Sequence, residues 1–399
     1  MSKKTLMILG GSRYVIPLIL KAKELDIFTI TVDYIPNNIA HSYSDLYLNI
    51  SVIDKEAVLK AAKKYKIDGI TAFACDPAVC TMAYVSNKLS LPSVGPYNSV
   101  CILQNKGKFR LFLKENGFNV PFSGSYTTFS GLKKDINKFA FPLIIKPTDS
   151  AGSKGVSKVD NLDMLDGAFK FAINNSISKQ VIVEEFIEPA GHPSDSDCYS
   201  IDGKLAFCSF SNQFFDRQSV NPFVPCGFTW PSGMSSDYQN YLTNELQRLI
   251  TLLGMKTSLY NVETRVSKNG VPYIMEVSPR GGGNRISEML FHHTNIDIIK
   301  KHIIDCVGIT DANVNLDPKT TKPVGEVILH SNSDGKFNCV NIPQEFKHFL
   351  VEEDLWIRKG DYVNSFIGAN NSIGTIVYMN FDISDFDKIL KETRVNLNE

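Results

Sequence analysis

The sequence predicts an α/β protein whose N-terminal domain is a doubly wound parallel sheet, followed by α+β regions and a small β-rich C-terminal part. Up to residue 75, apolar strand-like segments alternate with helix-like segments, as in a parallel sheet covered by helices. Residues 259–278 instead hold two strand-like runs joined by a tight turn, and residues 322–380 are rich in short strand-like runs. This change of pattern indicates several domains, for which 399 residues are enough.

The first domain contains three strand-like and two helix-like segments. Strands are expected at 4–11 (KTLMILGG), 28–34 (FTITVDY) and 69–75 (GITAFAC), and helices at 14–26 and 54–66. Ligands of such sheets bind at the carboxyl ends of the strands. The candidates at that edge are Gly10, Gly11, Ser12, Asp33 and Asp76.

The same edge allows a dinucleotide-binding interpretation, because Asp33 follows Gly10 at nearly the spacing of a ribose-binding acid. Residues 10–15 read GGSRYV and lack the later glycines of G-x-G-x-x-G, which disfavours that interpretation.

Two acids occupy matching places in the predicted hairpin. One strand reads LYNVETRV with Glu263, the other reads YIMEVSPRGGGN with Glu276, and the turn SKNG joins them. Antiparallel pairing puts the two carboxylates side by side, where they repel each other unless a cation neutralises them. Hard oxygen ligands of this kind suit Mg²⁺ that carries phosphates. A solvated outer face is the alternative for two isolated acids, but apolar neighbours such as Val262 and Val277 favour a packed sheet.

A second motif lies upstream, in the segment FAFPLIIKPTDSAGSKGVSKV. It runs from a buried strand into Lys146, then into a Ser/Gly-rich loop, then into another strand near Val156. Backbone N–H groups of such a loop can close over phosphate oxygens, with Ser150, Ser153 and Lys154 as further donors. The loop joins two strands, so it is not a P-loop, and alone it also fits a plain hairpin.

The third motif is QVIVEEFIEPAGH, an apolar strand that leads into two acids and aliphatic residues. The end of such a strand can offer backbone groups to an adenine edge while apolar side chains sandwich the ring.

The order of these motifs resembles the ATP-grasp superfamily, in particular its carboxylate–amine (amino-acid) ligases, from about residue 4 to about residue 385. The resemblance implies a Rossmann-like N-terminal domain that helps form the substrate pocket, a small ATP-grasp subdomain with the glycine-rich loop, a large subdomain with the metal site, and a β-rich C-terminal subdomain. The corresponding ranges are 1–105, 106–188, 189–310 and 311–399.

The resemblance also implies roles for single residues. Lys106 and Lys146 would contact phosphates, the loop from Ser150 to Gly155 would fold over the β/γ end, and Arg280 would lie beside the γ-phosphate and the acyl group. The hinge would hold adenine, with the Glu184 side chain at the exocyclic amine and the Ile187 N–H at the ring. The hinge residues are Glu184, Glu185, Phe186 and Ile187. The metal ligands would be Glu263, Glu276 and Ser278.

Two positions depart from the family pattern. Ser278 stands where the family usually has Asn, and it is a shorter and weaker oxygen donor. The acid that binds ribose usually follows the hinge closely, and several residues compete for that role here. They are Glu188, His192, Asp195 and Asp197.

The implied chemistry is phosphorylation of a carboxylate by ATP to an acyl phosphate, which an amine then attacks, with Mg²⁺ as the metal and Mn²⁺ as an alternative. Arg280 can hold two oxygens of the acyl phosphate, and Arg265 or Arg285 could anchor a second carboxylate. The aromatic and proline-rich segment 212–232 is the candidate substrate-facing loop. Carbamoyl-phosphate-type chemistry and an ATP-binding regulatory protein without turnover remain as alternatives.

Residues 286–308 are predicted to form an amphipathic helix that breaks near Thr294 and packs on the ATP sheet, with His292 and His293 packed or on its surface rather than ligands. The tail after Lys322 is predicted to be β-rich, with a last helix near SDFDKILKETR.

Composition limits the choice of partners. Lys plus Arg and Asp plus Glu both number 42, and no basic run stands out, which argues against nucleic acid. No apolar stretch is long enough to span a bilayer, and the start MSKKTLMILGGS does not fit a signal peptide, so a cytoplasmic protein is expected. The eight Cys include no CxxC pair, which indicates neither zinc nor a disulfide framework. The expected partners are a small carboxylate and a small amine, and a homodimer is compatible with the resemblance.

Overall fold

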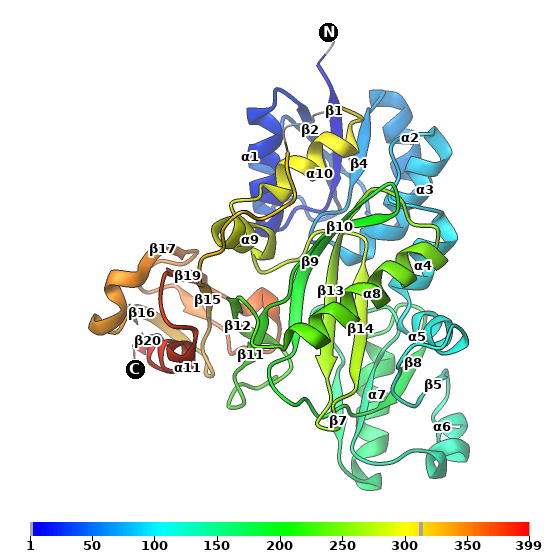
Figure 1. The fold of residues 1–399 in the computed structure, drawn as a ribbon, viewed down its shortest axis with the longest axis vertical. Helices are drawn as coiled ribbons and strands as arrows, with labels where there is room; N and C mark the ends of the chain where they lie inside the picture. Colours follow the sequence, from blue (N-terminus) through cyan, green and yellow to red (C-terminus); the bar gives the residue numbers. More distant parts are fainter. Residues whose placement is uncertain (1–2, 311–313, 399) are drawn as a thin grey trace.

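The computed structural model describes residues 3–310 and 314–398. Its N-terminal sheet is parallel throughout, with strand order β3-β2-β1-β4, as the alternating pattern predicts (Figure 1). The strands are β1 (Thr5–Leu9), β2 (Phe28–Asp33), β3 (Leu46–Asn49) and β4 (Gly69–Thr71). The helices after them are α1 (Ile16–Glu24), α2 (Lys55–Tyr65) and α3 (Val79–Leu89). The sequence did not predict β3, a short and only half-buried edge strand.

A second sheet, at the bottom of Figure 1, has the order β5-β8-β6-β7 and is antiparallel throughout. Its strands are β5 (Ser123–Tyr126), β6 (Leu143–Pro147), β7 (Ser157–Val159) and β8 (Val181–Glu185). Helices α5 (Lys106–Glu115), α6 (Phe129–Asp135) and α7 (Leu165–Asn174) accompany it. The predicted strands on both sides of the Ser/Gly-rich loop are confirmed, because β6 pairs with β7.

The central sheet has the order β10-β9-β13-β14 and carries the predicted hairpin. Its strands are β9 (Ser194–Ile201), β10 (Lys204–Cys208), β13 (Ser258–Val266) and β14 (Pro272–Ser278), with α8 (Ser236–Leu252) and α4 (Tyr97–Gln104) against it. Gly270 in the turn has a φ of 75°, a region that glycine enters without strain. One hydrophobic cluster, which includes Met7, Leu103, Leu246 and Val277, joins this sheet to the N-terminal sheet. The two sheets therefore share one core.

The C-terminal sheet corrects the interpretation of residues 212–232. This segment is not a loop but a hairpin, β11 (Asn212–Phe215) and β12 (Pro225–Trp230), which extends the sheet in the order β11-β12-β15-β19-β17. The remaining strands are β15 (Val324–Leu329), β17 (Leu350–Leu355) and β19 (Gly374–Met379). The domain boundary that the sequence predicted at residue 310 therefore separates strands of one sheet, because β11 and β12 lie before it and the other three strands after it. The smaller sheet of this part has the order β18-β16-β20: β18 (Tyr362–Val363), β16 (Gly335–Asn341) and β20 (Arg394–Asn398), with α11 (Phe386–Glu392) nearby.

The break near Thr294 is confirmed, because α9 (Ile286–Thr294) ends at Asn295 in the left-handed region and α10 (Ile298–Cys306) follows. Helix α9 contacts the central sheet at β9 and the C-terminal sheet at β15, whereas α10 packs mainly against α1 and also contacts β4 and β13 (Figure 1). His293 is buried and bonds the Lys322 carbonyl, which agrees with a packed histidine. Among the described residues no helix has both the length and the apolarity to cross a membrane.

Candidate active site

The predicted acid pair forms as expected, because Glu263 on β13 stands opposite Glu276 on β14. Asp195 on β9 stands opposite Glu263 on its other side, so a row of three carboxylates crosses three strands. Burial, and then the charge of Glu276, raise the pKa of Glu263 above its ordinary value. Within residues 3–310 and 314–398, the Glu263 carboxylate has no hydrogen-bond or ion-pair partner, so this position fits a cation.

The donor set of this site is small. No group of three or more His, Cys, Asp or Glu side chains in the described parts of the chain could hold a metal ion. The two carboxylates of Glu263 and Glu276 therefore fit a divalent ion only if other oxygens, such as those of a polyphosphate, complete its coordination.

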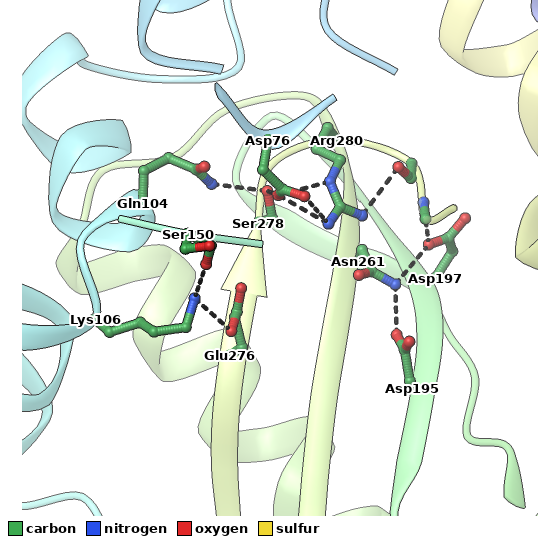
Figure 2. Close-up of polar contacts among 12 residues, drawn as sticks. Asp76, Gln104, Lys106, Ser150, Asp195, Asp197, Asn261, Glu276, Ser278 and Arg280 are labelled. Atoms are coloured by element: carbon green, nitrogen blue, oxygen red, sulfur yellow. Dashed lines mark hydrogen bonds and ion pairs between the residues drawn. The ribbon is translucent and has the colours of Figure 1, made fainter. Parts of the chain in front are cut away.

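Lys106 links the acid row to the Ser/Gly-rich loop. Its Nζ lies 3.1 Å from Glu276 and donates to the Ser150 carbonyl at 3.0 Å (Figure 2). The side chain of Asn105 caps the start of α5 and fixes the position of Lys106 at its first residue. Burial acts to lower the pKa of Lys106, but the nearby carboxylates, Glu276 first, outweigh it and raise the pKa. The ammonium is thus charged and stands between the acids and the loop.

Lys146 belongs to a second buried charge cluster. Its Nζ lies 2.7 Å from one oxygen of Glu184, and Arg110 Nε donates to the other oxygen at 2.6 Å. Although burial opposes ionisation, Arg110 and Lys146 lower the pKa of Glu184 to about 2. Burial lowers the pKa of Lys146. Each oxygen of Glu184 thus accepts one bond from a cation and keeps a second lone pair, so the adenine role assigned to this side chain stays a prediction.

The glycine-rich loop between β6 and β7 is held from two sides. Its Ser150 carbonyl accepts from Lys106, and Ser153 Oγ donates to the Phe223 carbonyl at 2.7 Å. Lys154 is exposed. Gly155 has a φ of 75°, and a Cβ there would lie 2.8 Å from Pro147 and Asn175, so only glycine fits.

Among the described residues, Glu185 and Phe186 of the hinge bond within the protein, whereas the N–H of Ile187 does not. Glu185 accepts from the Ala140 N–H at 2.8 Å, and the Phe186 N–H donates to the Pro142 carbonyl at 2.9 Å. The Ile187 N–H has no hydrogen-bond partner in the part of the chain that the structure describes, as a nucleotide-base contact requires.

Arg265 and Arg285, the two candidates for a second carboxylate anchor, both bond within the protein. Arg265 Nη1 donates to the Ile187 carbonyl at 2.9 Å, which places it at the hinge. Arg285 bonds Thr375 and pairs with Glu288 and Glu352, which ties α9 to the C-terminal sheet.

The four candidates for ribose binding separate into two groups. Glu188 is exposed and pairs with Lys268, and His192 is exposed with its ring 4.2 Å from that of Phe214. Asp195 and Asp197 are instead buried in β9, where Asn261 donates to both (Figure 2). Of the four candidates, only Glu188 and His192 present exposed side chains, and the choice of the ribose-binding residue stays a prediction.

Arg280 joins the ATP-grasp-like strands to the N-terminal sheet. Its Nε and Nη2 donate to the two oxygens of Asp76 at 2.9 and 2.8 Å, and its Nη1 donates to the Gly281 carbonyl at 3.1 Å (Figure 2). Asp76 follows β4, at the edge that the sequence predicted for ligands. Burial acts to raise the pKa of Asp76, but Arg280 outweighs it and lowers the pKa.

Ser278 is held in the same network. Its hydroxyl donates to Asp76 at 3.0 Å and accepts from Gln104 Nε2 at 2.7 Å, and the residue is 1% exposed. These two bonds join α4, β14 and the segment after β4. In this structure Ser278 therefore bridges two elements, and its predicted role as a metal ligand stays a prediction.

Sequence reasoning missed Gln104, Arg110 and Asn261. Arg110 lies one helical turn after Lys106, so an (i, i+4) pattern of cations was a usable signal. Gln104 and Asn261 gave no signal, because neutral amides on an amphipathic helix and in a strand have no distinctive pattern.

Comparison with known proteins agrees with this arrangement. Residues 139–288 match the family described as the ATP-grasp domain. The chain is 25% identical over 307 residues to the carbamoyl phosphate synthase large chain of Thermoanaerobacter sp. (strain X514), which covers 69% of this chain and 28% of that protein. It is 26% identical over 201 residues to a D-alanine–D-alanine ligase of Parabacteroides distasonis, over 47% of this chain and 58% of the relative. The chain spans less than a third of the length of the synthase relatives, 28% and 31% of the first two.

Solved structures match the whole fold. An L-amino acid ligase from Bacillus licheniformis superposes with a TM-score of 0.80 at 19% identity, over 100% of this chain and 99% of that one. A phosphoribosylglycinamide synthetase from Anaerococcus prevotii gives 0.77 at 21% identity, over 100% of both chains. A biotin carboxylase domain from Hydrogenobacter thermophilus, solved with MgADP and bicarbonate, gives 0.73 at 14% identity over 98% of this chain and 90% of that one.

Proposed function

Because residues 139–288 match the family described as the ATP-grasp domain, we propose that the chain is an ATP-dependent ligase that activates a carboxylate as an acyl phosphate for attack by an amine, releasing ADP and phosphate. One observation carries the proposal: Lys106 lies between Glu276 and the Ser150 carbonyl. A buried ammonium between an acid pair and a glycine-rich loop is suited to the place where a polyphosphate meets its metal ion.

In this proposal ATP lies along the line from the hinge to the acid row. The Ile187 N–H contacts adenine, and Glu188 or His192 contacts ribose. Lys146 and Lys106 bind the phosphates, under the loop Ser150 to Gly155. Glu263 and Glu276 would hold Mg²⁺, or Mn²⁺ in its place, which supplies charge neutralisation at the β/γ end.

Arg280 is proposed to hold the acid substrate. A guanidinium has five N–H donors, and two of the five on Arg280 bind Asp76 while a third binds Gly281. One N–H on Nη1 and one on Nη2 remain, and together they can hold two oxygens of one carboxylate or acyl phosphate. Asp76 thus orients Arg280, and the proposed substrate pocket lies between the N-terminal sheet and the metal hairpin.

A second candidate is carbamoyl-phosphate-type phosphorylation of bicarbonate, which the synthase relatives favour. This chain matches only part of those relatives and would use a partner or a second copy for the remaining steps. Bicarbonate-dependent release of phosphate without any organic acid would identify this chemistry.

The proposal is tested by phosphate release from ATP and Mg²⁺ over a panel of amino acids supplied singly and in pairs. The ligase predicts release that depends on both an acid and an amine, and that falls in Glu276→Gln but not in Glu345→Gln, a matched change at an exposed acid. Release that no acid or amine stimulates, with ATP binding intact, would instead indicate a regulatory ATP-binding protein and refute the ligase. We also propose a cytoplasmic location, where ATP is abundant, and leave monomer and homodimer to be separated by light scattering.

A further inference from the structure

A cavity of about 440 Å³ lies in the C-terminal part of the chain, bordered by β11, β12, β15, α11 and β20. Its volume falls in the range of about 300–1,000 Å³ that is usual for small-molecule sites. Its lining contains none of the residues proposed to bind ATP, metal or the acid. The apolar part of its lining comes from buried Cys226, Val327 and Leu329 and from half-buried Leu390 and Leu397.

The rim of this cavity carries unpaired charges of both signs. Asp387 and Lys391 on α11 and Arg394 at the start of β20 are exposed. None of these three side chains makes a hydrogen bond or ion pair within the described residues. Asp387 and Lys391 stand four residues apart on one helix, a spacing that usually permits an ion pair, and they do not form one. The rim of the cavity therefore presents two cations, Lys391 and Arg394, and one anion, Asp387, to a ligand.

The opposite wall is connected to the ATP site. Asp216 accepts from Asn332 Nδ2 at 2.8 Å and from the Gln218 N–H at 2.8 Å, and it lies 3.3 Å from His330 Nε2. These bonds fix the start of the loop 216–224 against the end of β15.

The far end of the same loop holds the glycine-rich loop. The Phe223 carbonyl accepts from Ser153 Oγ at 2.7 Å, and Asn221 Nδ2 lies 3.4 Å from the Ser153 carbonyl. The backbone of the loop 216–224 thus connects the cavity wall at Asp216 to the loop proposed to cover ATP, with hydrogen bonds at each of its two ends.

We propose that this cavity binds a small zwitterion with an apolar side chain, an aliphatic or aromatic amino acid, and that its binding strengthens ATP binding through the loop 216–224. The carboxylate of such a ligand pairs with Arg394 and Lys391, its ammonium group pairs with Asp387, and its side chain contacts the apolar part of the lining at Leu390 and Leu397. The ligand braces the wall that carries Asp216, and so stabilises the surface on which Ser153 docks. The effect on ATP binding rests on the proposed function, whereas binding of the amino acid to the cavity does not.

The binding is tested by calorimetry without ATP or Mg²⁺, using L-valine, L-leucine and L-phenylalanine as probes. At least one of them is expected to bind, and N-acetyl-L-leucine and L-leucine amide, which each lack one charge, to bind at least about tenfold more weakly, the loss expected for one charged hydrogen bond. Arg394→Gln and Asp387→Asn should each weaken binding similarly. Lys388→Gln, on the same helix but outside the cavity lining, should not.

Arg280→Gln distinguishes this cavity from the proposed substrate site, because it should leave amino-acid binding to the cavity unchanged. The proposal is overturned if no probe binds, or if Arg280→Gln abolishes binding while Arg394→Gln preserves it.

The coupling is tested by ATP titrations with and without the bound amino acid. ATP affinity should rise about fivefold or more in the native protein, the lower end of usual coupling, and should not change in Arg394→Gln. An equal ATP affinity with and without the amino acid would overturn the coupling. Failure to bind ATP at all would count against the ligase function and leave the amino-acid titration as the test of the site.

Discussion

Replacement of Asp76 by Asn tests whether this residue orients Arg280 for the acid substrate. Asn keeps the shape, but it puts an NH₂ donor against one of the guanidinium N–H groups that now bind Asp76 at 2.9 and 2.8 Å. One charge-assisted hydrogen bond is lost, which corresponds to about 1.5–3 kcal/mol. If that bond orients Arg280 toward the acid, kcat/KM for the acid falls about 10- to 150-fold. The KM for ATP should change much less, because among the described residues Asp76 makes no hydrogen bond or ion pair with Lys106, Lys146 or the hinge and acts on Lys106 only through its charge.

Steady-state kinetics with the acid varied at saturating ATP, and then with ATP varied at saturating acid, give both quantities. Asp163→Asn is the matched control, an identical change at an exposed carboxylate outside both proposed sites. The reasoning is refuted if Asp76→Asn lowers the melting temperature while kcat/KM for the acid remains that of the native protein. Asp76 would then only join the domains.

Three further changes test other parts of the structure. Lys146→Ala should weaken ATP binding in calorimetry by about 1.5–3 kcal/mol, the value of a charged hydrogen bond, and an unchanged affinity would remove Lys146 from the site. Ser278→Asn should lower the melting temperature and leave the Mg²⁺ dependence of activity unchanged, because the larger amide does not fit between Gln104 and Asp76; a changed Mg²⁺ dependence would instead make Ser278 a ligand. Burial raises the pKa of Glu326 from its ordinary 4.5 to about 8, and both its oxygens lack hydrogen-bond partners among the described residues. Unfolding therefore releases its proton between these two pH values, and native stability falls as the pH rises through that window. Glu326→Gln should therefore raise the melting temperature more at pH 8 than at pH 5, and an equal shift at both would show that Glu326 is charged at neutral pH.

The parts of the fold that the sequence predicted are those with local signals. The turn SKNG and the alternation around Glu263 and Glu276 specify their hairpin within some twenty residues, and the structure pairs them in that register. The hinge and the loop after Lys146 were found for the same reason, since each follows directly from an apolar strand.

The missed parts depend on contacts between distant residues. Asp76 and Arg280 are 204 positions apart, and Arg110 and Glu184 are 74 apart, so no local pattern links either pair. Residues 212–232 were interpreted as a loop because their Pro and aromatic residues suit a surface segment. They form strands because β15 offers β12 a partner nearly a hundred residues later in the chain.

The central claim is that the γ-phosphoryl group goes to a carboxylate. The most direct test is to identify the nucleotide product, and to add hydroxylamine in place of the amine to trap the activated acid. The account predicts ADP together with a hydroxamate, both of them lost in Glu276→Gln; AMP and pyrophosphate as the products would contradict it even if ATP binding were established.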